Sequence, residues 1–264
     1  MSLLLWILLF SVIGGLLSVS LAALFLLLPR LHQDRLLPHL VSFATGALLG
    51  AAFIGLLPEA IEGAGPHVHQ VLMTTLAGVM GFFLLEKMVL WRHCHSAGCE
   101  AHDPAELGAA AGGRPQSAAG VLIAIGDGIH NMLDGVLIAA AFLTDFHLGV
   151  VTALAVTAHE IPQELGDFAI LLHSGFSNAA ALALNLASST TTVIGAVVAY
   201  FSLESAQGWQ PYVLAVAAAS FIYIAVADLI PGLHRRVDVR GTVQQLVLIG
   251  LGILLIVVAH RTLY

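Results

Sequence analysis

The chain has 264 residues, of which 59% are hydrophobic and only 9% are charged. A soluble domain carries about 25% charged residues, so this chain has too few of them to cover a water-facing surface, which excludes a soluble protein. The formal charge of −7 is a poor guide to partners, because the position of each charge relative to a bilayer matters more than the sum. We therefore expect an all-α integral membrane protein that contacts lipid and no nucleic acid.

Eight apolar segments are long enough to cross a bilayer as helices, which takes roughly 20 residues each. The first has no Lys or Arg before it and is too long for the apolar part of a signal peptide, so we expect it to be retained. In chain order, the predicted spans are 3–28, 38–60, 70–91, 118–143, 148–173, 178–201, 211–232 and 241–260. They are predicted to form one domain over residues 1–264, with a flexible His- and Cys-containing loop at about 92–117.

The basic residues predict how these spans are oriented. If the N-terminus lies outside, only Arg261 falls on the outer side. The other eight of the nine Lys and Arg residues fall on the inner side: Arg30, Arg35, Lys87, Arg92, Arg114, Arg235, Arg236 and Arg240. Because basic residues gather on the cytoplasmic side, both termini are predicted to be extracytoplasmic, in a multi-pass protein of the cell (plasma or inner) membrane.

Polar side chains gather at about mid-depth in the fourth and fifth predicted spans. Asp127, His130 and Asp134 are spaced i, i+3, i+7, so they share one helix face. The fifth span carries its own polar group: His159, Glu160, Gln163, Glu164 and Asp167. Charged groups at that depth normally face the protein interior or a water-filled path, and imidazole with carboxylate suits Zn²⁺, Fe²⁺ and Mn²⁺. The two helices are therefore predicted to bind a divalent metal ion.

Two other classes of protein use the same ligand types. The stretch from His159 to Gln163 resembles the HExxH motif of zinc proteases, in which the glutamate is the general base. Gln163 stands where that motif has its second His, so an intramembrane metalloenzyme ranks below transport and we do not expect an enzyme. A metal-sensing receptor is the other alternative, and plain polar packing between helices is the simplest one.

The sequences HNMLDG (130–135) and HEIPQELGDFAIL (159–171) resemble the paired signature helices of the ZIP family of divalent-metal transporters. Three further stretches agree with the family: FATGALLGAAFIGLLPEA (43–60), FFLLEKMVLWRHCHS (82–96) and FIYIAVADLIPG (221–232). The likeness covers nearly the whole chain. It implies eight transmembrane helices with extracytoplasmic termini, and uptake of Zn²⁺ into the cytoplasm, with Fe²⁺, Mn²⁺ and Cd²⁺ as further substrates.

The resemblance also implies a binuclear metal centre between the fourth and fifth helices. The first site would use His130, Asp134, His159 and Gln163. The second would use Asn131, Asp134 and Glu160, so that Asp134 bridges the two ions. A residue of the sixth helix, either Asn185 or Ser189, is expected to complete the second site.

The chain departs from the subgroup it most resembles at three positions. Gln163 stands where these relatives usually have His, while Ala51 and Gly55 stand where they often have Asp and His. Each change removes a metal donor, so we expect a weaker preference for zinc and a less tightly held ion.

Other residues are candidates for the path to and from the centre. They are Glu59 near the outer end and Asp127, Glu164, Asp167 and His173 along the fourth and fifth spans. The loop adds His93, Cys94, His95, Cys99 and His102, which either accept incoming metal or belong to a solvated linker. Helix faces of small residues permit a homodimer without requiring one.

Overall fold

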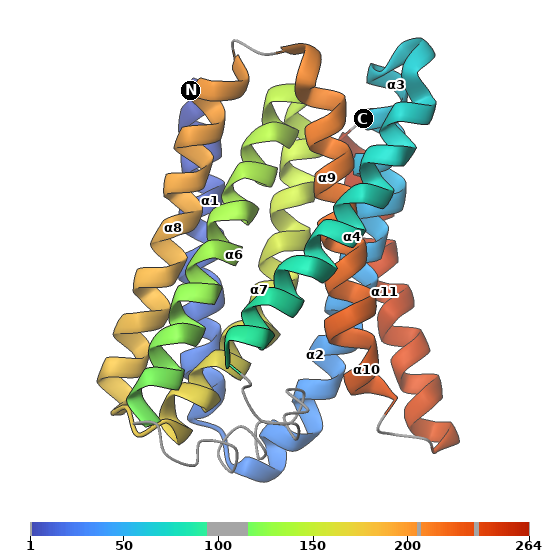
Figure 1. Cartoon of the computed structure of the whole chain (residues 1–264). Coiled ribbons are helices and arrows are strands. Elements are labelled where there is room, and N and C mark those ends of the chain that lie inside the picture. Colours follow the sequence, from blue (N-terminus) through green and yellow to red (C-terminus); the bar gives the residue numbers. More distant parts are fainter. Residues whose placement is uncertain (1, 94–115, 205–206, 235–237, 264) are drawn as a thin grey trace.

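The computed structural model describes the chain except for residues 1, 94–115, 205–206, 235–237 and 264. Throughout the described residues the chain forms helices and their connections, with no strand. Figure 1 shows these helices side by side in one elongated bundle, with the start of the first helix and the end of the last at the same end. In chain order the main helices are α1 (Leu3–Leu26), α2 (Arg30–Gly50), α3 (Leu57–Gly63), α4 (Val68–His93), α6 (Gln116–Thr144), α7 (Phe146–His173), α8 (Asn178–Glu204), α9 (Gln210–Tyr223), α10 (Ile230–Leu233) and α11 (Val239–Leu263).

Seven helical stretches of the described chain are long and apolar enough to cross a membrane. They include every predicted span except 148–173, which corresponds to α7. α7 has 28 residues, which is ample length, but its five mid-helix polar residues lower its mean hydropathy. The protein is thus an all-α, multi-pass membrane protein. The eighth span and the side on which the termini lie stay predictions.

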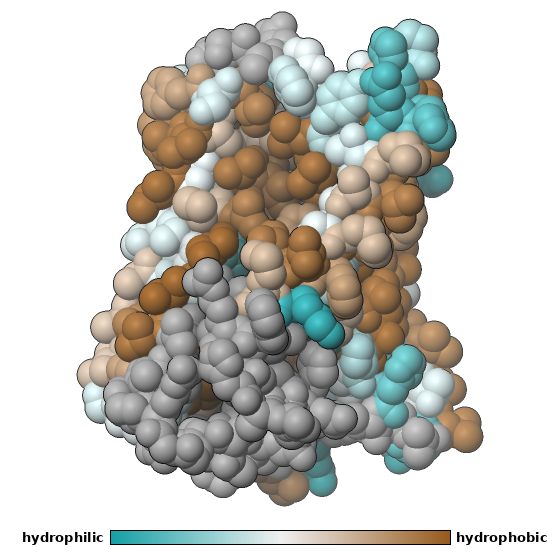
Figure 2. Space-filling model, viewed as in Figure 1, coloured by the Kyte–Doolittle hydropathy of each residue, from teal (hydrophilic) through white to brown (hydrophobic). Residues whose placement is uncertain are grey.

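Large hydrophobic side chains cover much of the outer surface of the bundle. Leu84, Phe201 and Leu246 are each more than half exposed. Figure 2 shows this apolar surface across the middle of the bundle, with hydrophilic side chains gathered over α3 at one end. A surface of this kind is suited to contact with lipid tails rather than with water.

The first predicted loop is helical instead. α2 begins at Arg30, eight residues before the predicted start at Pro38. The connection from α1 needs only a short turn, because the side-chain amide of Gln33 donates to the carbonyl oxygen of Leu26 at the end of α1, at 3.1 Å, and to that of Leu28 in the turn, at 2.9 Å. The sequence prediction was wrong here because polar residues in a helix outside the hydrocarbon look like a loop.

Two π-helical segments, Ala51–Leu56 and Ile224–Leu229, interrupt the second and seventh predicted spans. Each one ends two residues before a proline, Pro58 or Pro231. A proline ring in a regular α-helix clashes with the carbonyl four residues earlier, and here those carbonyls, of Ile54 and Ala227, lie inside the π-helical turns. The wider turns relieve that clash at these two prolines.

Glycines allow α6 and α8 to pack with their backbones almost in contact. A Cβ atom on Gly135 would overlap the carbonyl of Thr192, and one on Gly195 would overlap the carbonyl of Met132. α2 and α11 make a similar contact through Gly46. Small residues at such crossings are typical of membrane helices. This close approach brings side chains of α8 next to the polar face of α6.

Candidate metal centre

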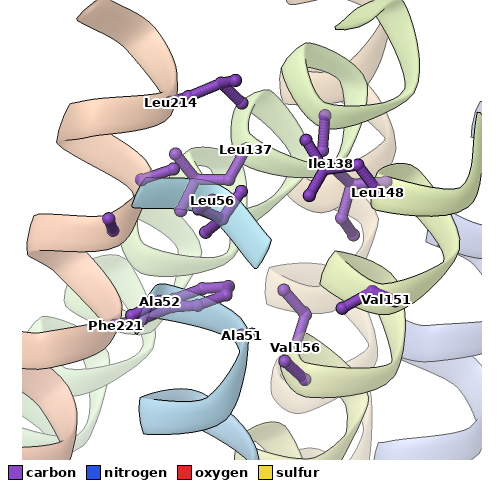
Figure 3. Packing of buried hydrophobic residues seen from close by; sticks show 14 of the residues in the cluster. Ala51, Ala52, Leu56, Leu137, Ile138, Leu148, Val151, Val156, Leu214 and Phe221 are labelled. Atoms are coloured by element: carbon purple, nitrogen blue, oxygen red, sulfur yellow. The ribbon is translucent and has the colours of Figure 1, made fainter. Parts of the chain in front are cut away.

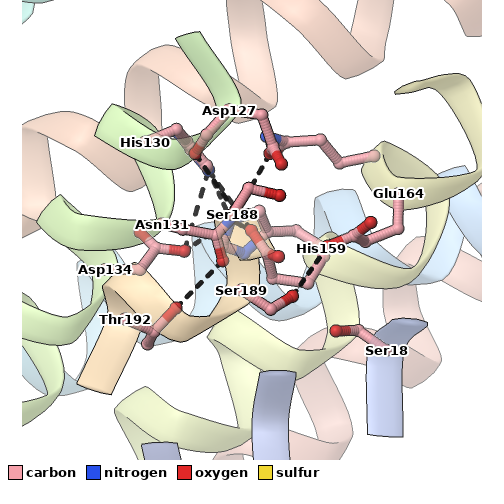
Figure 4. A network of polar contacts seen from close by, with 12 residues as sticks. Ser18, Asp127, His130, Asn131, Asp134, His159, Glu164, Ser188, Ser189 and Thr192 are labelled. Atoms are coloured by element: carbon pink, nitrogen blue, oxygen red, sulfur yellow. Dashed lines mark hydrogen bonds and ion pairs between the residues drawn. The ribbon is translucent and has the colours of Figure 1, made fainter. Parts of the chain in front are cut away.

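Four side chains that could bind a metal ion converge where α6 and α7 face each other. α6 supplies His130 and Asp134, and α7 supplies His159 and Glu160. One ligand atom from each of these residues lies within 4.8 Å of all the others. Asp134, His159 and Glu160 are almost fully buried, while the side chain of His130 is 22% exposed. The predicted helix pair therefore assembles a compact group of side chains (Figure 4), of which only His130 is partly exposed.

Five of the six distances among the four ligand atoms are close to those around one tetrahedral ion. His159 Nε2 lies 3.1 Å from Asp134 Oδ2, 3.3 Å from His130 Nε2 and 3.8 Å from Glu160 Oε1. His130 Nε2 lies 3.7 Å from Asp134 Oδ2 and 3.5 Å from Glu160 Oε1. Zinc bound to nitrogen and oxygen at about 2.0–2.1 Å in a tetrahedron separates its ligands by about 3.3 Å. The observed distances lie around that value, so the four groups need little movement to bind an ion.

A hydrogen bond at one nitrogen of the His159 ring fixes the direction of the lone pair on the other nitrogen, Nε2, which points into the cluster. Its Nδ1 atom lies 3.1 Å from the carbonyl oxygen of Ala155, so Nδ1 carries the proton that it donates to this oxygen. A second hydrogen bond of this kind is the usual way in which proteins orient a metal-binding imidazole. Nε2 then faces the carboxylate of Asp134 as one acceptor facing another. Two acceptors at 3.1 Å repel each other unless a cation or a proton lies between them.

The carboxylates of the centre have few hydrogen-bond donors. None of the four carboxylate oxygens of Glu160 and Asp134 accepts a hydrogen bond from the described residues. Buried polar atoms are nearly always paired in folded proteins, and an unpaired buried carboxylate is costly. A bound cation would offset this cost, because it would contact one oxygen of each carboxylate and neutralise the charge of both.

The two amide side chains predicted as ligands contact Asp127 instead. Asn131 donates to the carboxylate of Asp127 at 3.0 Å and to its backbone carbonyl at 3.2 Å. The amide nitrogen of Gln163 lies 3.4 Å from the same carboxylate. The oxygen of Asn131 accepts a hydrogen bond from the hydroxyl of Thr192 at 2.9 Å (Figure 4). Asp127 is thus the centre of a second polar group beside the four ligand atoms.

The sixth-helix candidates lie beside Glu164, one turn further along α7. Ser189 donates to the Glu164 carboxylate at 3.0 Å, and Asn185 donates to the Glu164 backbone carbonyl at 3.3 Å. Thr192 is the residue of this helix that contacts Asn131, and the sequence analysis did not identify it. A signal was present, since residues 188–192 are five consecutive hydroxyl residues inside an apolar span.

The remaining candidates lie away from the four ligand atoms or cannot be placed. Glu59 is half-buried in α3 and interacts electrostatically with Asp145 and His260 at one end of the bundle. Asp167 is half-buried and interacts electrostatically with Asp127 and Glu164. Cys94, His95, Cys99 and His102 lie outside the described residues, as do the side chains of His93 and His173.

The two positions where this chain lacks a donor are packed with apolar side chains. Ala51 is fully buried in the main hydrophobic cluster. A Cβ atom on Gly55 would meet a methyl group of Leu148 at 3.3 Å. The π-helical turn between α2 and α3 therefore contributes hydrophobic packing here, where an Asp and a His would have contributed ligands.

Access to the centre differs between its two sides. Toward the turn that joins α6 to α7, residues 137–142 and most of residues 148–156 are buried. Phe221 of α9 closes this side with its ring 6.0 Å from that of His159, centre to centre, among the apolar side chains of Figure 3. On the other side His130, Gln163 and Asp167 are only half-buried. The side chains toward the end that carries Glu59 are thus more deeply buried than these three.

Comparison with known proteins finds relatives among the zinc transporters. The family model described as "ZIP Zinc transporter" matches residues 92–260. Human zinc transporter ZIP4 is 31% identical over 258 residues, covering 78% of this chain and 40% of ZIP4. Zinc transporter ZIP13 of Pongo abelii is 33% identical over 234 residues, covering 84% of this chain and 66% of ZIP13. Human ZIP13 is 32% identical over 259 residues, covering 84% and 70%. The chain thus spans from less than half to about two thirds of the length of these relatives.

Proposed function

Because the chain belongs to the ZIP zinc transporter family, we propose that it carries divalent metal ions, zinc above all, across a cell membrane into the cytoplasm. The ion would bind to His130, Asp134, His159 and Glu160 at the contact between α6 and α7. Fe²⁺, Mn²⁺ and Cd²⁺ are further substrates in this proposal, because carboxylate and imidazole together accept several divalent ions.

One observation carries the proposal. The lone pair of His159 Nε2 faces the carboxylate of Asp134 at 3.1 Å, because Nδ1 of the same ring donates to the carbonyl of Ala155. Such an arrangement is unfavourable without a positive charge between the two atoms, and it is the arrangement that a metal ion requires. The unpaired oxygens of Glu160 support the same reading.

A second ion is part of the proposal, with Asp134 as the bridging ligand. It would bind Asn131 and Glu160, while Gln163 would bind the first ion weakly through its amide oxygen. In the described conformation both amides contact Asp127. The second ion therefore needs a change in this hydrogen-bonded group before it can bind.

The difference in burial between the two sides of the centre supports a direction of transport. If the termini lie outside, the apolar layer around Phe221 and Leu148 closes the centre to the outer side. The ion would then leave past Gln163 and Asp167 toward the cytoplasm. Alternating access requires the opposite arrangement as well, in which this apolar layer opens and Glu59 meets the incoming ion.

An intramembrane protease is the weaker alternative. A zinc protease needs three protein ligands and an open position for water, with a glutamate that acts as base. Here the glutamate of the HExxH-like stretch, Glu160, is itself one of the four converging ligands, and Gln163 replaces the second His. We therefore propose a transporter rather than an enzyme or a metal-sensing receptor.

Uptake of radioactive zinc, manganese and iron into proteoliposomes, with no peptide present, tests the proposal. The wild-type protein should accumulate zinc, and His130→Ala and Asp134→Ala should lower uptake to the level of protein-free vesicles. His32→Ala, which changes an exposed imidazole, should leave uptake unchanged. Wild-type uptake by either site variant would refute the assignment of the centre.

A further inference from the structure

Asn131 and Thr192 form a contact that bears on how many ions the centre holds. The Thr192 hydroxyl donates to Asn131 Oδ1 at 2.9 Å, and this oxygen is the atom through which an amide binds a metal. Both residues are almost fully buried, so water does not compete with this bond. The hydroxyl hydrogen places partial positive charge beside the oxygen that a second cation would need.

The rest of the network fixes the orientation of the Asn131 amide. Its nitrogen donates to two oxygens of Asp127, at 3.0 and 3.2 Å. If the amide were flipped, its oxygen would face both of these acceptors, which is unfavourable. Asn131 Oδ1 must therefore point away from Asp127 and toward α8, where Thr192 meets it. Asp127 orients the ligand, while Thr192 competes for its ligand atom.

We propose that Thr192 is a positioning residue that limits the centre to one ion in the described conformation, and that its hydroxyl must release Asn131 before a second ion binds. The inference rests on the proposed function, because it concerns the same metal centre. It implies that the second site is filled only after the Thr192 hydroxyl turns away from Asn131, either by rotation of its own side chain or by a shift of α8 relative to α6. The close backbone contact of these helices at Gly135 and Gly195 makes them the pair through which such a shift would act.

The test counts zinc ions per chain in the purified full-length protein, at a series of buffered free zinc concentrations. Thr192→Val removes the hydroxyl and keeps the shape of the side chain, and should tighten binding of the second ion about three- to ten-fold, as expected for loss of one competing hydrogen bond. Thr192→Ala should also tighten binding of the second ion. Thr192→Ser keeps a hydroxyl and should behave as wild type.

Two controls separate this effect from weakened helix packing and from zinc bound elsewhere. Thr191 donates to the Gly128 carbonyl at 2.5 Å, so Thr191→Val also removes a hydrogen bond from α8 to α6 but should not change the second ion. Adding Asn131→Leu to Thr192→Val should abolish the gain, because the second ion then lacks its amide ligand. Zinc on other parts of the chain is common to all these variants and cancels.

The outcomes distinguish this inference from the proposed function. If the wild-type chain holds no zinc that His159→Ala removes, the proposed function fails and the inference fails with it. If the first ion is present but Thr192→Val leaves the second unchanged or weakens it, only the inference is overturned. A weaker second ion would mean that the hydroxyl supports Asn131 as a ligand rather than competing for it.

Discussion

Replacing Asp134 by Asn should have opposite effects on the metal-free and the zinc-bound protein. The new amide N–H would lie about where Asp134 Oδ2 now lies, 3.1 Å from the lone pair of His159 Nε2, and can donate to it. A repulsive contact between acceptors becomes a hydrogen bond, which contributes on the order of 1 kcal/mol. We therefore expect Asp134→Asn to raise the thermal stability of the metal-free protein, whereas Asp134→Ala should lower it by leaving a cavity.

Zinc should stabilise the same variant much less than the wild type. Losing an outer partner of a metal ligand lowers affinity about 10- to 100-fold, so neutralising a ligand should cost at least about 100-fold. At a zinc concentration 100 times the wild-type Kd, binding stabilises the wild type by about 2.7 kcal/mol and a variant with 100-fold weaker affinity by about 0.4 kcal/mol. Thermal unfolding of the detergent-solubilised protein with and without zinc measures both effects.

Asp238→Asn is the matched control, because it makes the same charge change at an exposed residue and Asn also caps helices well. Its zinc response should equal that of the wild type. A zinc-induced stabilisation of Asp134→Asn as large as the wild-type value would refute our placement of Asp134 in the centre. If Asp134→Asn lost as much metal-free stability as Asp134→Ala, the inference that His159 Nε2 and Asp134 Oδ2 face each other as two acceptors would be refuted.

Three further predictions use other residues. Gly135→Ala should destabilise the protein by more than about 2 kcal/mol, because the added methyl overlaps the backbone of α8. Gly126 has open space around it, so Gly126→Ala should be neutral or stabilising. Denaturation in mild detergent compares the two variants, and equal effects would contradict the close contact between α6 and α8. Gln163→His should raise zinc affinity relative to manganese in a binding assay, and an unchanged ratio would exclude Gln163 as a ligand. A cysteine at Gly112 should be labelled only from the cytoplasmic side and one at Gly208 only from outside, so labelling of both from one side would overturn the predicted topology.

The sequence predicted that the four side chains would lie on facing helices because their positions depend on local regularity, while their binding of a metal ion stays a prediction. A helix places residues 130 and 134, four apart, on one face, and the short turn at Asp145 makes α6 and α7 antiparallel neighbours. Apolar runs likewise located most helices to within a few residues, since the lipid-facing and buried surfaces are both hydrophobic. Residue spacing, a short turn and an apolar run are all properties of one helix or of two successive helices, so they can be read from the sequence.

What the sequence left open depends on contacts between elements far apart in the chain. Thr192 meets Asn131 only because glycines bring α8 against α6. Gln163 reaches Asp127 on another helix, and the spacing of polar residues along α7 cannot show whether an amide faces an ion or a carboxylate. The early start of α2 was missed for a related reason, since the bonds from Gln33 to the end of α1 replace the loop that polar composition predicted.

The π-helical turns also determine where the chain can change in length. Such a turn holds one residue more than the α-helical turn that it replaces. Deleting one residue from Ile224–Leu229, together with Pro231→Ala, would restore a regular helix and leave both flanking segments in register. A deletion within α6 or α8 would instead rotate every later side chain of that helix by about 100° and disperse the ligands. Related chains that differ by one residue are therefore expected to differ at these two segments rather than within the helices of the metal centre.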